Sequence, residues 1–194
     1  MTFLKHAMIA AALICATANV AQAADSYKIH EDHTWVTFSI SHAGWANARG
    51  MFRNVSGDIV FDKEDVTNSS VSVVIASDSL DTNSEQRDRD MGGADFLNSI
   101  EFPEITFQST RIEQTGDRTA IIYGDMTMVG VSREIALDAV WNNEMALPWD
   151  ASTVKTGFSA TATLDGVDFG MNKLVDFGLG PVINVVIDAE ALKQ

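Results

Sequence analysis

Apolar and polar residues alternate with a period of two through most of the chain beyond residue 24. In the segment 36–41, for example, Val36, Phe38 and Ile40 alternate with polar residues. The same pattern recurs at 59–61, 71–75, 105–107, 135–139, 158–164 and 183–187. Because successive side chains of a strand point to opposite faces, this period predicts antiparallel strands and an all-β protein.

Turn-forming residues separate these runs, and the three prolines lie in or beside the breaks. Several runs reach about ten residues, or roughly 33 Å of strand. Long strands have edges that promote aggregation, and closing the sheet removes those edges. We therefore expect an antiparallel β-barrel of about eight strands, although a sandwich remains open. A barrel of this size is filled by its own side chains or holds one small ligand.

Residues 1–23 have the pattern of a secretory signal peptide. Lys5 precedes an apolar run, and the triplet Ala21-Gln22-Ala23 supplies the small residues of a cleavage site. The run is shorter than the roughly 20 residues of a membrane span, and no later segment reaches that length. We expect an exported protein with one domain at 24–194 and no integral membrane segment. Cys15, the only cysteine, would be removed with the peptide.

The chain is acidic, with 27 Asp and Glu against 13 Lys and Arg and a net charge of −14. The negative electrostatic potential of such a protein repels nucleic acid and anionic membrane surfaces, so we expect neither as a partner. Solubility is the simplest explanation of the charge.

Three histidines raise the question of a metal site. His30 and His33 are close in sequence, and His42 follows. On a regular strand, residues three apart point to opposite faces, and the segment lacks the i, i+4 spacing of a zinc-protease helix. We therefore expect structural histidines, no metal and no cofactor. The sequence beyond residue 23 also has no cysteine, phosphate loop or evident acid–base pair, so we do not expect an enzyme.

Large, flexible apolar side chains are more informative. The chain has ten phenylalanines and eight methionines, and Met126 and Met128 share one strand face. Methionine adapts its shape to irregular apolar partners. An ordinary core and a pocket for a long apolar ligand are both consistent with this composition.

Four segments, 27–52, 79–110, 124–138 and 165–171, resemble in order the blocks of the YceI-like family of exported polyisoprenoid-binding proteins. The first block matches at His33, His42, Gly44, Gly50 and Phe52; the second at Asp81, Thr82, Arg87, Asp88, Asp95, Phe96, Pro103, Phe107 and Ser109; the last two at Gly124, Thr127, Gly130, Leu137, Asp168, Phe169 and Gly170. The chain departs from the family where Asp90 replaces the usual histidine and near Gly93, where a serine is usual.

The resemblance implies a lipocalin-like barrel with a short helical segment and no catalytic residues. It also implies a periplasmic carrier of a long-chain apolar lipid such as a polyisoprenoid, an isoprenoid quinone or a fatty amide. We expect the lipid to contact Phe38, Ile40, Phe52, Val73, Ile75, Phe96, Phe107, Met126, Met128, Phe158 and Phe169. Arg87 and His42 are candidates for contacts with a lipid head group.

The dense polar segment 87–95 suggests a short helix. Ser84 would cap it, Gly92 and Gly93 would end it, and Phe96 and Phe102 would fold back over one end of the barrel. Surrounding carboxylates favour ion pairing as the role of Arg87 over contact with a ligand.

Two other functions remain open. One is a stress-response or protein-interaction module with a filled barrel and no ligand. The other is an enzyme acting on an isoprenoid quinone with a metal at His33 or His42. A homodimer is also open.

Overall fold

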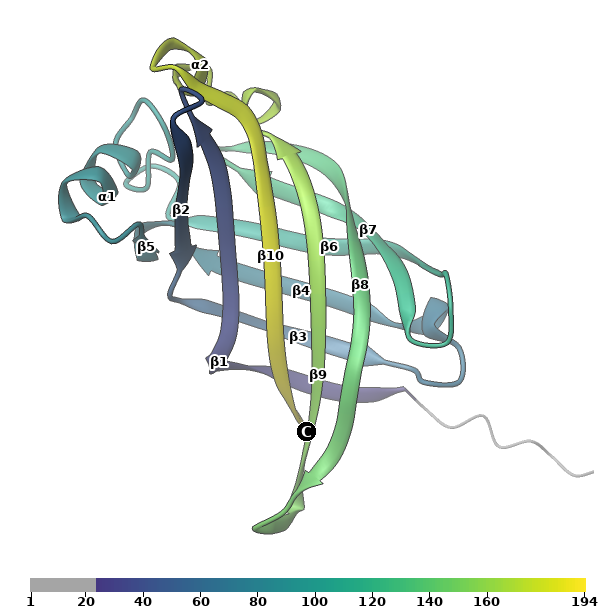
Figure 1. The fold of residues 1–194 in the computed structure, drawn as a ribbon. Coiled ribbons are helices and arrows are strands. Elements are labelled where there is room, and N and C mark those ends of the chain that lie inside the picture. Colours follow the sequence, from purple (N-terminus) through teal and green to yellow (C-terminus); the bar gives the residue numbers. More distant parts are fainter. Residues whose placement is uncertain (1–23) are drawn as a thin grey trace, which may run out of the picture.

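The computed structural model describes residues 24–194, and the predicted signal peptide at 1–23 lies outside the described residues. Ten strands form one antiparallel sheet (Figure 1). They are β1 (Asp25–His42), β2 (Ala46–Phe52), β3 (Val55–Phe61), β4 (Ser70–Ala76), β5 (Leu80–Asp81), β6 (Glu104–Gln114), β7 (Thr119–Met128), β8 (Val131–Leu147), β9 (Asp150–Asp165) and β10 (Leu179–Lys193).

Eight of these strands close into a barrel, which confirms the predicted fold. The order around it is β1-β3-β4-β6-β7-β8-β9-β10, and β10 pairs with β1 to complete the ring. The short pair β2 and β5 extends the sheet beyond β3 and β4 at one end. Closure leaves the strands of the ring without a free edge, as expected for strands of this length.

Helical segments lie at both ends of the barrel. The α-helices α1 (Glu85–Met91) and α2 (Lys173–Asp176) lie at one end, at the left and top of Figure 1. The 3₁₀ segments are η1 (Val66–Asn68), η2 (Ser77–Ser79) and η3 (Gly166–Phe169). The Ser84 hydroxyl accepts from the Arg87 backbone N–H at 3.4 Å, and Gly92 caps the other end of α1, so the predicted helix is confirmed.

Register shifts in β1, β6 and β8 change which residues face the barrel interior. In β1 the pairing with β10 shifts between Ile29 and Thr34, so inward positions change from odd to even numbers. In β6 a similar shift lies between Ser109 and Arg111, so inward positions change from odd numbers, as at Phe107, to even numbers, as at Ile112. Bulges of this kind bend a strand and help a sheet to curve into a barrel.

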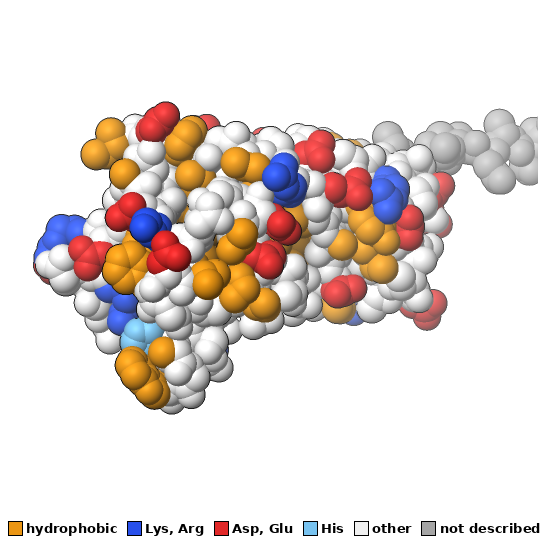
Figure 2. All heavy atoms as spheres, turned by 90° about the horizontal axis from the view of Figure 1, so that it is seen from above, with side chains coloured by type: hydrophobic (Ala, Val, Ile, Leu, Met, Phe, Trp, Pro, Cys, Tyr) orange, Lys and Arg blue, Asp and Glu red, His pale blue; other side chains and the backbone are white. Residues whose placement is uncertain are grey.

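The outer surface exposes both charged and apolar side chains. On the face shown in Figure 2, acidic side chains lie between several small hydrophobic patches. This spread of charge agrees with the simple role in solubility expected from the sequence. Within residues 24–194, no helix has the length and apolar character needed to cross a membrane.

Candidate functional site

An apolar cavity of about 270 Å³ runs through the barrel interior. All eight strands of the barrel ring contribute side chains to its wall, most of them branched aliphatic residues or methionine. The side chains of the wall are small at the alanines of β8, β9 and β10, and this leaves space along the barrel axis. A cavity of this kind has space for a small ligand, whereas the alternative prediction expects a filled barrel.

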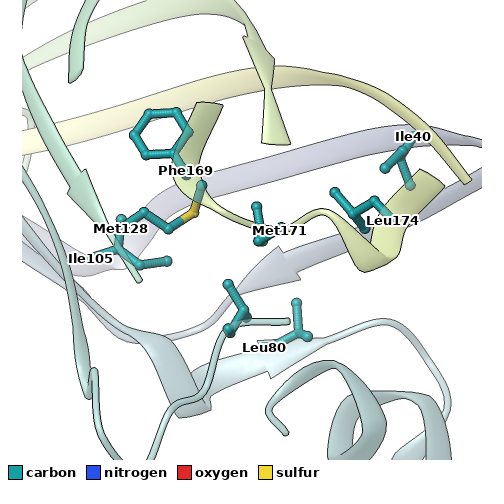
Figure 3. Close-up of a cluster of buried hydrophobic side chains, with 8 residues drawn as sticks. Ile40, Leu80, Ile105, Met128, Phe169, Met171 and Leu174 are labelled. Carbon is teal, nitrogen blue, oxygen red and sulfur yellow. The ribbon is translucent and has the colours of Figure 1, made fainter. Parts of the chain in front are cut away.

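Buried apolar side chains close the cavity at the end with α1 and α2. Leu97 follows α1, Leu174 lies in α2, and both line the cavity while being at most 6% exposed. Figure 3 shows Leu174 beside Ile40 and Met171 between Leu174 and Met128. The η3 segment and α2 pack closely, because a Cβ at Gly166 would lie 2.5 Å from Leu174 Cδ1.

The opposite end of the cavity reaches the surface. Its lining there includes exposed polar residues in and next to the β6–β7 turn, among them Gln114, Asp117 and Arg118, together with Lys63 from the end of β3. We call these four residues the polar mouth. An elongated amphipathic molecule fits such a cavity with its apolar end deep and its polar end at the mouth.

Three aromatic rings lie just inside the polar mouth. Phe61 packs edge-on against Trp141 and Phe158, with ring centroids 5.3 and 5.2 Å apart. The guanidinium of Arg118 lies 4.9 Å from the Trp141 ring, and the Trp141 indole N–H donates to Thr156 Oγ1. We call Phe61, Trp141 and Phe158 the aromatic collar, because these rings narrow the cavity next to the polar mouth. Their edge-to-face contacts fix the ring orientations.

A hydrogen-bonded charge network supports the same end of the barrel. The buried Tyr27 phenol donates to Glu144 Oε2 at 2.5 Å, and Lys63 donates to Glu144 Oε1 at 2.6 Å. Burial alone raises the pKa of the Glu144 carboxyl, but the bonds from Lys63 and Tyr27 outweigh it and hold that pKa below its usual value. Burial, followed by the bond to Glu144, raises the pKa of Tyr27, which stays a neutral donor.

Nine of the eleven residues predicted to contact lipid line the cavity. They are Phe38, Ile40, Phe52, Val73, Ile75, Phe107, Met126, Met128 and Phe158. Phe96 and Phe169 do not belong to the lining found in the described chain. Phe169 is buried in the closing cluster, and Phe96 packs outside it, 5.8 Å from the Phe177 ring centroid. Both aromatic residues therefore support the closed end.

The two candidate head-group residues lie away from the cavity. His42 is exposed at the end of β1 and packs edge-on against Trp45. Arg87 donates from Nε to Thr82 Oγ1 at 2.8 Å and from Nη2 to the Thr82 carbonyl at 2.5 Å. Asp88 accepts from the Thr82 backbone N–H and hydroxyl. The expected pairing of Arg87 with a carboxylate is thus replaced by bonds to Thr82, which tie α1 to the barrel.

Sequence reasoning missed part of the cavity. Trp141 continues the odd-numbered alternation of β8, so extending that run two residues beyond 139 would have found it. Met171 and Leu174 lie in the connection after β9, where no strand period marks them.

The bulge in β1 also changes the positions of two histidines. We expected His30 and His33 to point to opposite faces, but their rings stack with centroids 4.6 Å apart. The expectation was wrong because the segment between Ile29 and Thr34 is not a regular strand.

Comparison with known proteins identifies close relatives. The model of the YceI-like domain matches residues 27–191. The chain is 37% identical to the UPF0312 protein PputGB1_5030 of Pseudomonas putida strain GB-1 over 199 residues, covering 98% of this chain and 99% of that protein. A UPF0312 protein of Ectopseudomonas mendocina is 36% identical, with 98% of this chain and all of the relative covered.

Solved structures share the fold at lower sequence identity. Burkholderia cenocepacia BcnA superposes with a TM-score of 0.75 at 16% identity, covering 84% of this chain and 98% of its own. A YceI protein of Campylobacter jejuni gives 0.70 at 24% identity, with 96% and 99% covered. A polyisoprenoid binding domain from Saccharophagus degradans gives 0.66 at 12% identity, with 89% and 100% covered. These three matches establish the barrel fold.

Proposed function

Because this chain belongs to the YceI-like family, we propose that it is a binding protein for a long-chain apolar lipid held inside the barrel. The observation that carries the proposal is the apolar cavity of about 270 Å³, closed at one end and polar at the other. A structural relative, the Saccharophagus domain, is described as polyisoprenoid binding, which supports the same class of ligand. We propose a carrier or reservoir rather than an enzyme.

Burial of the chain supplies the binding energy. Each buried methylene contributes about 0.8 kcal/mol, so a chain of moderate length binds tightly without directional contacts. The wall between the closed end and the aromatic collar offers mainly apolar contacts. A polyisoprenoid, an isoprenoid quinone tail or a fatty amide satisfies this requirement.

The size of the cavity limits how much of the ligand it holds. Pockets for small molecules usually measure about 300–1,000 Å³, and this cavity lies just below that range. A long isoprenoid therefore either extends past the aromatic collar or spreads the barrel wall. In both cases the polar head lies at the mouth, beside Lys63, Gln114, Asp117 and Arg118.

The proposed location is the periplasm. The predicted signal peptide at 1–23 supports export, and an apolar lipid needs a protein container to cross an aqueous compartment. A carrier of this kind shields the chain from water between two membranes.

A binding titration with a variant pair tests the proposal. Delipidated protein is titrated with an isoprenoid alcohol, and binding is followed by tryptophan fluorescence. Met126→Asp places a charge in the cavity wall, whereas Thr127→Asp places one on the outer face of the same strand. We expect Met126→Asp to lose binding and Thr127→Asp to retain it, with circular dichroism showing that both variants fold. Equal binding by both variants would exclude the cavity as the site.

A further inference from the structure

The bulge of β1 gathers three metal-ligating side chains on the barrel exterior. His30 and His33 stack with 9° between ring planes, and Glu190 of β10 lies beside them. His33 Nδ1 is 3.3 Å from Glu190 Oε2. One ring nitrogen from each histidine and one carboxylate oxygen lie within 4.8 Å of one another.

One of these side chains has a buried polar atom without a partner. Within residues 24–194, no hydrogen-bond partner is found for His30 Nδ1, although that atom is buried. Buried polar atoms are nearly always bonded, and an exception often indicates a missing water or ion. A cation bound by the neutral imidazole would satisfy this nitrogen.

We propose that His30, His33 and Glu190 bind a divalent transition-metal ion of the zinc class. Imidazole nitrogen suits zinc, copper and nickel, and three protein ligands leave a further position for water. In a tetrahedral site with bonds of about 2.1 Å, neighbouring ligand atoms lie about 3.4 Å apart. The spacing of 3.3 Å between His33 and Glu190 matches this value, and it exceeds the roughly 2.7–2.9 Å of a charge-assisted hydrogen bond. An ion lies in the plane of each imidazole that binds it, so the stacked His30 ring must turn about its Cβ–Cγ bond to bring a nitrogen to the same ion.

Lys155 has a defined role at this site. Its ammonium donates to Glu190 Oε2 at 2.5 Å, and so holds in place the oxygen that lies 3.3 Å from His33 Nδ1. A partner that holds a ligating carboxylate resembles the outer shell of known metal sites. The positive charge also opposes a nearby cation, so Lys155 has two effects of opposite sign on the metal affinity.

The metal site and the lipid cavity are separate. Thr34 and Ala189, which follow His33 and precede Glu190, line the cavity, while His33 itself is exposed. Neighbouring side chains of β10 point to opposite faces, so Glu190 lies on the outside of the wall, where the exposed His33 contacts it. Loss of zinc binding and loss of lipid binding are therefore distinguishable in the same protein.

Isothermal titration with zinc chloride tests the proposal. The protein is produced without a polyhistidine tag, stripped with a chelator and dialysed before titration. We expect one equivalent of zinc to bind. His33→Ala and the isosteric Glu190→Gln should each weaken binding more than about 100-fold, because even outer-shell partners contribute about 10–100-fold.

Two further variants make the assignment specific. His42→Ala removes an exposed histidine outside the cluster and should leave zinc binding unchanged. Lys155→Met leaves all three ligands in place, so this variant should still bind one equivalent of zinc. Absence of zinc binding, or binding that persists in both His33→Ala and Glu190→Gln, would overturn the proposal. Unchanged circular dichroism excludes unfolding as the cause of a loss.

Discussion

The Tyr27 phenol donates a 2.5 Å hydrogen bond to Glu144, although 117 residues separate the two. Tyr27 lies near the start of β1 and Glu144 lies in β8, so the bond joins distant parts of the barrel. Tyr27 is 1% exposed, and its partner is a charged carboxylate. Tyr27→Phe should lower the free energy of unfolding by about 1.5–3 kcal/mol, measured by urea denaturation.

The same network predicts how stability depends on pH. The folded protein holds the pKa of Glu144 below its usual value, so this group stabilises the fold above about pH 4.3, the value in an unfolded chain. The stabilisation is lost as pH falls through the lower, folded pKa. We expect the free energy of unfolding to drop below about pH 4.3. Glu144→Gln should flatten that drop, whereas Glu31→Gln at an exposed site should not.

Close packing at one glycine gives a third prediction. A Cβ at Gly124 would lie 2.5 Å from both the Phe107 ring and the Gln108 carbonyl oxygen. Gly124→Ala should therefore cost about 1–3 kcal/mol of stability by thermal or chemical unfolding. At Gly157 the nearest atom to an added Cβ is 3.8 Å away, so Gly157→Ala should be neutral or slightly stabilising. Equal destabilisation by the two changes would contradict this packing.

The role of Arg87 can be separated from ligand binding. Arg87→Ala removes two hydrogen bonds to Thr82 and should cost about 1–3 kcal/mol, while lipid retention is unchanged. The matched change Arg89→Ala, at an exposed residue of the same helix, should alter the free energy of unfolding by less than about 0.5 kcal/mol. A stable Arg87→Ala protein that retains less lipid would instead support a head-group contact.

Much of this fold could be predicted from the sequence. In a closed barrel, each strand turns one set of alternate side chains to the apolar interior and the other set to solvent, so the strands appear as alternating runs. The runs in β8, β9 and β10 keep one parity over most of their length, but of their inward residues only Phe158 was predicted to contact lipid. The shifts after Ile29 and Ser109 could not be predicted, because a bulge leaves no separate signal in the pattern. The closing residues Met171 and Leu174 were missed for a related reason: their positions depend on tertiary packing rather than on a local period.

A narrower cavity should hold less lipid. Ala160 lines the cavity in β9, and Ala160→Phe places a ring in the space available to the chain. We expect a shorter or substoichiometric ligand, measured by mass spectrometry of the intact complex under native conditions. Thr161→Phe adds the same ring at the exposed neighbouring position and should leave the ligand unchanged. Unchanged ligand length and stoichiometry in Ala160→Phe would remove this part of the wall from the site.

The central claim is that the barrel carries a long-chain lipid. The most direct test is organic extraction of the protein, purified from its native cells without detergent, followed by mass spectrometry of the extract. The account predicts about one isoprenoid or other long-chain lipid per protein chain. An empty extract, even after incubation with isoprenoid lipids, would contradict it.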